Sequence, residues 1–400
     1  MPKGAPGVPK LTKPDLPIVP APKTDTPVYV MGVGLHKFGR FPDKDFGELG
    51  RIAALRALED AGVPYEDIPI VYSTSMQQGA AWGTKITNAL GARGIPVVNM
   101  EAACCSTVAA MAQAVYAIAS GAYDVVLCVG GEKQPRGFIP ALDMPVWKRM
   151  IGAGAYPIYY AQLMQRYMHE YGTTREQLAW ISVKSHKNAA LNPYAHYGNL
   201  PNLTVEEVLN GRMVVDPFTI YMIAPTSEGA GAIVLGNERA VRKYGCRQPI
   251  LVAGCVHVSH IYEWDELFYP PDLLRIAAMK VYEQAGVGPE DVDIAQVQDG
   301  MPIGEIEGLE DLGLCALGEG GTLAERGITW PDGDFPVNMD GGYMSRGNCI
   351  GATGAAQVAE IVTQLRGEAG PRQVSKIQPK VGLAHNMGAG IQCAVAILQK

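Results

Sequence analysis

Residues 99–115 read Asn99-Met-Glu-Ala-Ala-Cys-Cys-Ser-Thr-Val-Ala-Ala-Met-Ala-Gln-Ala-Val115. They follow an apolar run at residues 95–98 and open into an alanine-rich segment that reaches Ala119. This pattern predicts a strand that turns directly into a helix, with Cys104 at the junction. The N–H groups and partial positive charge of a helix N-terminus lower the pKa of a nearby thiol toward neutrality. A buried structural cysteine is the alternative, because free cysteines are among the most buried residues.

Composition limits the classes of protein to consider. The chain has 400 residues, 48% of them hydrophobic, and a net charge of −7. We expect more than one domain, no nucleic-acid partner, no membrane span and a cytoplasmic location. The eight cysteines form no CxxC pair, so neither a metal site nor a disulfide framework is expected.

Residues 1–26 are rich in proline and lysine and carry few large apolar side chains. Such a segment cannot bury enough surface to fold alone. We expect it to form an extended arm that lies on the rest of the protein or on a partner.

Strand patterns and helix patterns alternate from residue 27 onward. Residues 28–34, 68–75 and 125–131 read as buried strands, and apolar residues at helical spacing run from Leu49 to a stop at Ala61-Gly62. This alternation predicts an α/β layered fold with largely parallel pairing.

The second half of the chain repeats the first. Residues 51–68 and 275–292 are identical at 10 of 18 positions. The repeat predicts two similar halves, residues 27–245 and 246–400, packed together. Aligning Gln357 with Gln113 places Asn348 opposite Cys104, so two helix N-termini are expected to meet in one pocket.

A long insertion interrupts the first half at about residues 133–225. It is rich in methionine, tyrosine and tryptophan, and we expect it to be mainly helical. A binding wall for a bulky substrate and an ordinary packed cap are both consistent with this composition.

Three more segments have the composition of active-site loops: residues 297–301, 341–354 and 383–390. Of the seven histidines, only His385 lies in such a context. A single histidine is more often structural than catalytic, but the nearby glycines favour access to a pocket.

Five segments together resemble the thiolase superfamily, specifically the sterol-carrier-protein-type thiolases, and the resemblance runs from Val28 to the C-terminus. The segments are residues 101–106, 186–195, 224–230, 340–354 and 385–390. The resemblance implies duplicated βαβαβαββ halves that form a five-layered α-β-α-β-α core. It also implies that Cys104, in a Cys-x-Ser motif, accepts the acyl group.

Two loops depart from the pattern of that family. Its Gly-His-Pro loop is here Gly347-Asn-Cys349, and its His-Asp-Cys-Phe loop is here Gln298-Asp-Gly-Met301. Oxyanion donors are therefore expected from the side chain of Asn348, a water on Gln298, and the backbone N–H groups of Cys104 and Gly388. Proton transfer falls to His385 or Cys349, and His385 is favoured because an unperturbed imidazole titrates at a pKa of about 6.5.

The resemblance implies a thiolase that cleaves or forms a 3-oxoacyl-CoA through a cysteine acyl-enzyme, with coenzyme A as co-substrate and no bound cofactor. Contacts to the substrate or CoA are expected from Ser227, Met301 and Tyr343. The aromatic and methionine-rich insertion, together with the loop changes, suggests a bulky or aromatic substrate, and the resemblance points to benzoylsuccinyl-CoA as one example. A homodimer with a small OB-fold, zinc-binding subunit is the expected assembly.

Two other functions remain open at this point. A retro-aldolase of the steroid side-chain type shares this fold and this kind of partner, and Tyr343 is compatible with that chemistry. A non-catalytic protein that binds acyl-CoA or lipid is the other alternative.

Overall fold

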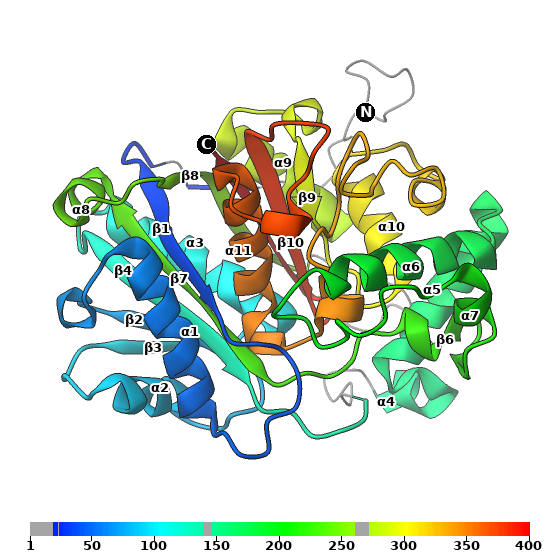
Figure 1. Cartoon of the computed structure of the whole chain (residues 1–400), viewed down its shortest axis with the longest axis horizontal. Coiled ribbons are helices and arrows are strands. Elements are labelled where there is room, and N and C mark those ends of the chain that lie inside the picture. Colours follow the sequence, from blue (N-terminus) through cyan, green and yellow to red (C-terminus); the bar gives the residue numbers. More distant parts are fainter. Residues whose placement is uncertain (1–18, 23, 139–145, 261–271) are drawn as a thin grey trace.

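The computed structural model describes residues 19–22, 24–138, 146–260 and 272–400 (Figure 1). Most of the expected N-terminal arm and residues 139–145 of the insertion lie outside these ranges. The described end of the arm lies on the body. There the Thr26 hydroxyl donates to the Ala119 carbonyl at 3.4 Å, and the Gln284 side-chain amide donates to the Pro22 carbonyl at 2.9 Å.

The N-terminal half contains a five-stranded part of the sheet in the order β3-β2-β4-β7-β1. Pairing is parallel from β3 to β4 and antiparallel at β7. The elements are β1 (Val28–Leu35), α1 (Phe46–Ala61), β2 (Val71–Thr74), α2 (Trp82–Leu90), β3 (Val97–Met100), α3 (Ser106–Ala119), β4 (Val125–Glu132), β7 (Gly229–Asn237) and α8 (Glu238–Tyr244).

The C-terminal half repeats this order with one strand fewer among the described residues. Its strands run β8-β11-β10-β9, and the counterpart of β3 is reduced to a single parallel bridge between Ala295 and Val337. The expected βαβαβαββ order is thus present in the second half with its third strand reduced to this bridge. The elements are β8 (Ile250–Ser259), α9 (Asp272–Ala285), β9 (Ile294–Gln296), α10 (Pro302–Asp311), α11 (Thr353–Arg366), β10 (Val381–Gly388) and β11 (Gln392–Gln399).

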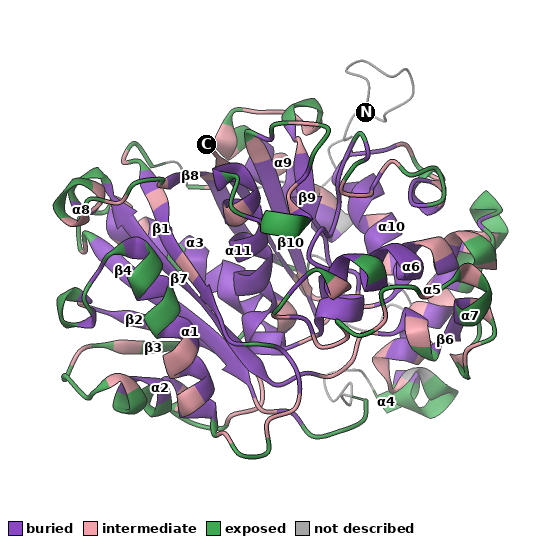
Figure 2. Ribbon diagram, in the orientation of Figure 1, coloured by how far each residue is buried: buried purple, intermediate pink, exposed green. Residues whose placement is uncertain are grey.

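The two halves join edge to edge, because β1 pairs antiparallel with β8 at Tyr29–Leu251 and Val30–Ile250. The result is one nine-stranded mixed sheet. Helices α3 and α11 contact strands of both halves, while α1 packs on β1 and β7, and α9 packs on β8 and β11. The expected layering is thus present, with α3 and α11 as the buried central layer (Figure 2).

Local sequence explains why α1 lies where it does. The Asp45 side chain caps the helix by accepting a hydrogen bond from the Glu48 amide, and Gly62 ends it in the left-handed region at φ 67°. Gly32 lets β1 approach closely, because a Cβ at that position would lie 2.3 Å from the Ala57 carbonyl oxygen.

The insertion contains α4 (Val146–Lys148), α5 (Tyr156–Tyr171), α6 (Arg175–Ala190), α7 (Val205–Leu209) and a short hairpin of β5 (Met213–Val215) and β6 (Phe218–Thr219). Met164 and Leu178 of this segment share a hydrophobic core with Ile303 and Ile306 of α10. The insertion of the first half therefore packs on the second half. None of the helices in the described ranges is long and apolar enough to cross a lipid bilayer.

Candidate active site

The turn that carries Cys104 is held by its own neighbours in sequence. Ala103 adopts φ 48°, a conformation that is strained for a residue with a side chain. The Glu101 carboxylate accepts a hydrogen bond from the Ala103 amide at 2.7 Å. The Ser106 hydroxyl accepts from the Ala102 amide at 2.8 Å and donates to the Ala103 carbonyl at 2.6 Å. These bonds explain why a serine follows two residues after the cysteine: the Ser106 side chain closes the turn that carries Cys104.

The two adjacent cysteines face different surroundings. Cys104 is partly exposed and lines a cavity, whereas Cys105 is fully buried and its thiol donates to the Ala102 carbonyl at 2.9 Å. Cys104 is therefore the thiol of this pair that a substrate in the cavity can reach.

The N-termini of α3 and α11 meet at this turn, as the repeat predicts. The Thr353 hydroxyl donates to the Cys104 carbonyl at 3.2 Å, and the Thr107 hydroxyl donates to the Gly351 carbonyl at 2.7 Å. A short 3₁₀ turn precedes each helix, at Ala103–Cys105 and Ile350–Ala352. These turns place Gly351, rather than Asn348, opposite Cys104 in the repeat. The expected register was off by three residues, because that alignment matched glutamines later in the helices.

The cavity at Cys104 has a volume of about 100 Å³. It brings together four residues that the sequence singled out besides Cys104: Gln298, Met301, Tyr343 and Asn348. The other lining residues are Met76, Ala103, Phe138, Tyr156, Pro157, Tyr160, Ile223, Ala224, Thr226, Gly300, Ile350 and Ala389.

Asn348 is fixed through its backbone. Its amide donates to the Pro225 carbonyl at 3.1 Å, and its carbonyl accepts from the Ser227 amide and the Gln134 side chain at 2.9 and 2.8 Å. Sequence reasoning missed Gln134, which lies in no motif. The Asn348 side chain hydrogen-bonds Cys104, which favours the thiolate.

Burial nevertheless has the largest effect on the pKa of Cys104. Desolvation raises the pKa of Cys104 to about 12, although the hydrogen bond to Asn348 lowers it. The expected shift toward neutrality at the helix N-terminus is therefore wrong for this arrangement. The neighbouring carboxylates of Glu132 and Glu101 also disfavour the negative sulfur.

Tyr343 is completely buried below the cavity, and Asp299 positions it. The Asp299 carboxylate accepts from the Tyr343 amide at 2.6 Å, and the Asn386 side chain lies 3.1 Å from the Tyr343 hydroxyl. Burial and Glu305 raise the pKa of Asp299 to about 7. Sequence reasoning quoted Asp299 without giving it a role, and its place directly after Gln298 was the available signal.

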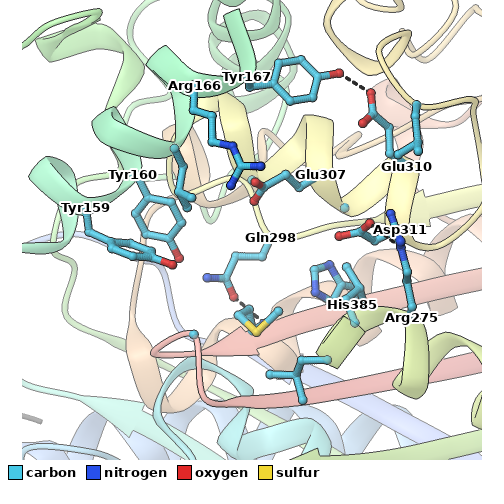
Figure 3. Close-up of a pocket in the computed structure, with 18 of the residues that line it drawn as sticks. Tyr159, Tyr160, Arg166, Tyr167, Arg275, Gln298, Glu307, Glu310, Asp311 and His385 are labelled. Atoms are coloured by element: carbon cyan, nitrogen blue, oxygen red, sulfur yellow. Dashed lines mark hydrogen bonds and ion pairs between the residues drawn. The ribbon is translucent and has the colours of Figure 1, made fainter. Parts of the chain in front are cut away.

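Gln298 lies between two cavities and lines both. Its side-chain oxygen accepts from the Met387 amide at 2.7 Å, which turns its NH₂ group toward Tyr160 (Figure 3). The two N–H groups of Gln298 therefore point into the space that a bound ligand would occupy.

His385 does not lie in a loop, as expected, but inside β10, where it pairs with Val395 of β11. It lines the second cavity, not the cavity of Cys104 (Figure 3). Desolvation lowers the pKa of His385 to about 3, so the expectation that it titrates near neutrality is corrected. Neither ring nitrogen has a hydrogen-bond partner within the described ranges.

Three other expected site residues are near the cavity without lining it. The thiol of Cys349 is buried and donates to the Gly229 carbonyl at 3.2 Å, and burial raises its pKa. The Ser227 hydroxyl is 2.8 Å from the His196 ring. Gly388 packs directly on the nucleophile turn, because a Cβ there would lie 2.3 Å from the Ala102 carbonyl oxygen.

Comparison with known proteins gives consistent family matches. Residues 28–137 match the family model described as thiolase, N-terminal domain, and residues 254–400 match thiolase C-terminal domain-like. The acetyl-CoA acetyltransferase of Methanothermobacter thermautotrophicus is 38% identical over 389 residues, covering 93% of this chain and 99% of that one. A benzoylsuccinyl-CoA thiolase subunit of Thauera aromatica is 36% identical, covering 92% and 96%. Human sterol carrier protein 2 is 34% identical, covering 92% and 71%.

Solved structures of similar fold cover almost the whole chain. The Ltp2-ChsH2(DUF35) aldolase superposes with a TM-score of 0.80 at 24% identity and covers 93% of this chain and 97% of that one. Human mitochondrial 3-ketoacyl-CoA thiolase in complex with CoA superposes with a TM-score of 0.71 at 16% identity and covers 94% and 98%. At these identities the likeness concerns the fold alone.

Proposed function

Because the chain belongs to the thiolase family as a thiolase of the sterol-carrier-protein type, we propose that Cys104 carries the acyl group in its reaction. The protein is an acyl-CoA C-acyltransferase that uses coenzyme A as a substrate. The observation that carries the proposal is the position of Cys104. Its thiol lines a cavity at the meeting point of two helix N-termini and hydrogen-bonds Asn348, while Cys105 is buried behind it.

The first half of the proposed reaction breaks a carbon–carbon bond. The Cys104 sulfur attacks the 3-keto carbon of a 3-oxoacyl-CoA, and the bond between carbons 2 and 3 then breaks. The acyl group stays on sulfur as a thioester, and the bonding electron pair leaves with carbon 2 as the enolate of the departing acyl-CoA. The enolate takes up one proton, which balances the proton lost by the thiol.

In the second half, the sulfur of a free CoA attacks the Cys104 thioester. The acyl group moves to CoA, the proton of the CoA thiol is returned to Cys104, and a shortened acyl-CoA leaves. Synthesis is the same sequence in reverse.

A negatively charged oxygen forms twice in this reaction, once in the tetrahedral adduct and once in the enolate. Preorganised N–H donors stabilise both. We assign this role to the NH₂ groups of Asn348 and Gln298 and to the backbone N–H groups of Cys104 and Gly388. The hydrogen bond that the Gln298 side-chain oxygen accepts from the Met387 amide leaves the Gln298 NH₂ group to donate to the oxyanion or to a water bound there.

Neither proposed acid–base residue lies in the cavity of Cys104. Cys349 is buried and donates to a backbone carbonyl, and His385 is neutral with a pKa near 3. We retain His385 as the group to test, since it lines the neighbouring cavity on the other side of Gln298. Met301 and Tyr343 are proposed as substrate contacts on the basis of their place in the cavity wall.

For the substrate we propose a bulky or aromatic 3-oxoacyl-CoA, of which benzoylsuccinyl-CoA is one candidate. Support comes from the tyrosines of the insertion at the two cavities and from the 36% identity to the Thauera subunit.

A homodimer that carries a small OB-fold, zinc-binding subunit is the proposed assembly. The name of the Thauera relative as a subunit supports a partner. Sedimentation of the full chain should show at least a dimer. A monomer that is fully active alone would overturn the proposed assembly.

The retro-aldolase remains the second candidate because of one observation. The Tyr343 hydroxyl is buried beside the cavity of Cys104, and its raised pKa keeps it a proton donor. Retro-aldol cleavage needs no acyl-enzyme, so the two functions differ in their dependence on Cys104.

The decisive experiment is intact-protein mass spectrometry after incubation with a 3-oxoacyl-CoA in the absence of free CoA. We expect a mass increase equal to one acyl group, located on Cys104 by peptide mapping and lost when CoA is added. Turnover without any acylated protein, unaffected by iodoacetamide, would support the aldolase instead.

A further inference from the structure

The second cavity lies between α5, α9, α10 and the β10–β11 hairpin and has a volume of about 420 Å³ (Figure 3). It shares Gln298 and Tyr160 with the smaller cavity of Cys104. The two cavities therefore adjoin at these two side chains, and a group attached to a carbonyl carbon at Cys104 lies on the side of Gln298 next to the second cavity.

Most of the wall of this second cavity is apolar or aromatic. Tyr159, Tyr160 and Leu163 of α5 face Leu273 and Leu274 of α9, with Leu317 and Met387 completing the apolar surface. Burying an aromatic or branched apolar group against such a wall is favourable.

The charged residues of the wall are almost all satisfied by one another. The Arg275 guanidinium pairs with Asp311 at 3.0 Å, and Arg166 pairs with Glu170 at 2.7 Å at the exposed rim. The Glu310 carboxylate accepts from the Tyr167 hydroxyl and from two backbone amides at 3.0 Å. Both arginines of the wall already face a carboxylate, and the wall carries more acidic side chains than arginines, so it disfavours an additional carboxylate.

Two polar groups of the wall have no internal partner within the described part of the chain. One is the His385 ring, which is 2% exposed and has both nitrogens unpaired. The other is the half-buried Glu307 carboxyl group, which lines the same cavity and for which no partner is seen among the wall residues (Figure 3). Burial and the nearby acids raise the pKa of Glu307 to about 8, so it is a neutral donor and acceptor at pH 7. The buried nitrogens of His385 are costly to leave without a partner, and a ligand oxygen would satisfy one of them while also reaching the carboxyl group of Glu307.

We propose that the second cavity binds the part of the acyl group beyond the reacting carbonyl and selects an uncharged group that combines a bulky or aromatic body with a hydroxyl or carbonyl oxygen. Glu307 and His385 hydrogen-bond that oxygen, and the tyrosines and leucines of α5 and α9 enclose the body. This inference deepens the proposed function and rests on Cys104 as the site of reaction.

Binding to the Cys104→Ala variant tests the inference without any turnover. Three probes differ only at one ring position: 3-oxo-3-phenylpropanoyl-CoA, its para-hydroxy analogue and its para-carboxy analogue. Isothermal calorimetry should show the hydroxy probe binding about three- to tenfold more tightly than the unsubstituted one, as expected for one hydrogen bond between neutral groups. The carboxy probe should bind more weakly than both.

Variants of the wall assign the effect to this cavity. Glu307→Leu should abolish the preference for the hydroxy probe, and Glu307→Gln, which keeps a donor and an acceptor without charge, should restore most of it. Leu163→Phe should weaken all three aryl probes by filling the cavity. His169→Phe adds the same ring on an exposed position of α5 outside the cavity and should leave all three affinities unchanged.

Two results would overturn the inference. A carboxy probe that binds most tightly would make the cavity an anion site that uses Arg166 or Arg275. Equal affinities for the three probes, unaffected by Leu163→Phe, would mean that the acyl group lies elsewhere. Because the assay measures binding to a variant that lacks the Cys104 thiol, its failure is separate from a failure of the acyl-enzyme proposal.

Discussion

The Thr353 hydroxyl at the start of α11 donates a hydrogen bond to the Cys104 carbonyl oxygen at 3.2 Å. Residues 249 positions apart in the chain are thereby joined at the nucleophile turn. Each half of the protein supplies one helix N-terminus to the site, so neither half contains the complete arrangement.

Replacing Cys104 with alanine should abolish both turnover and acyl labelling, because the nucleophile is removed. Cys105→Ala should spare both and lower only the stability, since that side chain is buried and directed away from the cavity. Steady-state kinetics and peptide mapping of the labelled protein measure the two effects. Label found on Cys105 in the wild-type protein would reverse the assignment.

The rate at which iodoacetamide alkylates Cys104 should rise with pH. Only the thiolate reacts, and a pKa of about 12 means that the thiolate fraction increases about tenfold per pH unit between pH 7 and 10. Asn348→Ala should slow alkylation about ten- to hundredfold at each pH, because it removes a hydrogen bond to the charged sulfur. Asn199→Ala removes the same kind of side chain at an exposed position that does not line the cavity, and this control should be alkylated at the wild-type rate. A plateau near pH 7 would show that the thiol pKa is low.

The role of His385 can be read from the pH dependence of kcat/KM between pH 5 and 9. A ring with a pKa near 3 stays neutral over this whole window, so it contributes no ionisation there. His385→Gln should therefore leave the shape of the profile unchanged and act through substrate affinity. If the variant loses a limb near neutrality together with at least about a hundredfold in rate, His385 is the acid–base group after all.

Stability should also depend on pH through the same ring. In the unfolded chain a histidine has a pKa of about 6.5, so below that pH the unfolded state binds a proton that the folded state with a pKa near 3 does not. The free energy of unfolding should thus rise with pH between about 3 and 6.5, and this contribution is complete above 6.5. Urea denaturation of wild type and His385→Gln at pH 5 and 7 measures it. An identical pH difference in both proteins would contradict the buried neutral ring.

Gly388→Ala should reduce kcat by at least about a hundredfold, as expected when a catalytic group is displaced by about an ångström. The added Cβ would lie 2.3 Å from the Ala102 carbonyl oxygen and 2.9 Å from the Cys105 sulfur, so the nucleophile turn must move. Gly198→Ala is the matched control, because its nearest neighbour would be at 3.4 Å. Equal activity of the two variants would show that the turn tolerates displacement.

Sequence alone predicted the parts that depend on local patterning and internal repetition. The spacing of hydrophobic residues and the position of a helix-ending glycine predicted three elements. They are the strand at residues 28–34, the helix that ends before Gly62 and the helix that follows Cys104. The duplication predicted the meeting of two helix N-termini, because similar halves place similar elements together.

The tertiary structure alone decided the environment of each site residue. His385 was expected to titrate near neutrality in a loop, yet pairing of β10 with β9 and β11 buries it in a strand and removes its charge. The packing of α5 on α10 likewise places Tyr160 and Glu307, which are 147 positions apart, around one cavity. Burial and desolvation depend on contacts between distant segments, and the spacing of residues along the chain contains no information about those contacts.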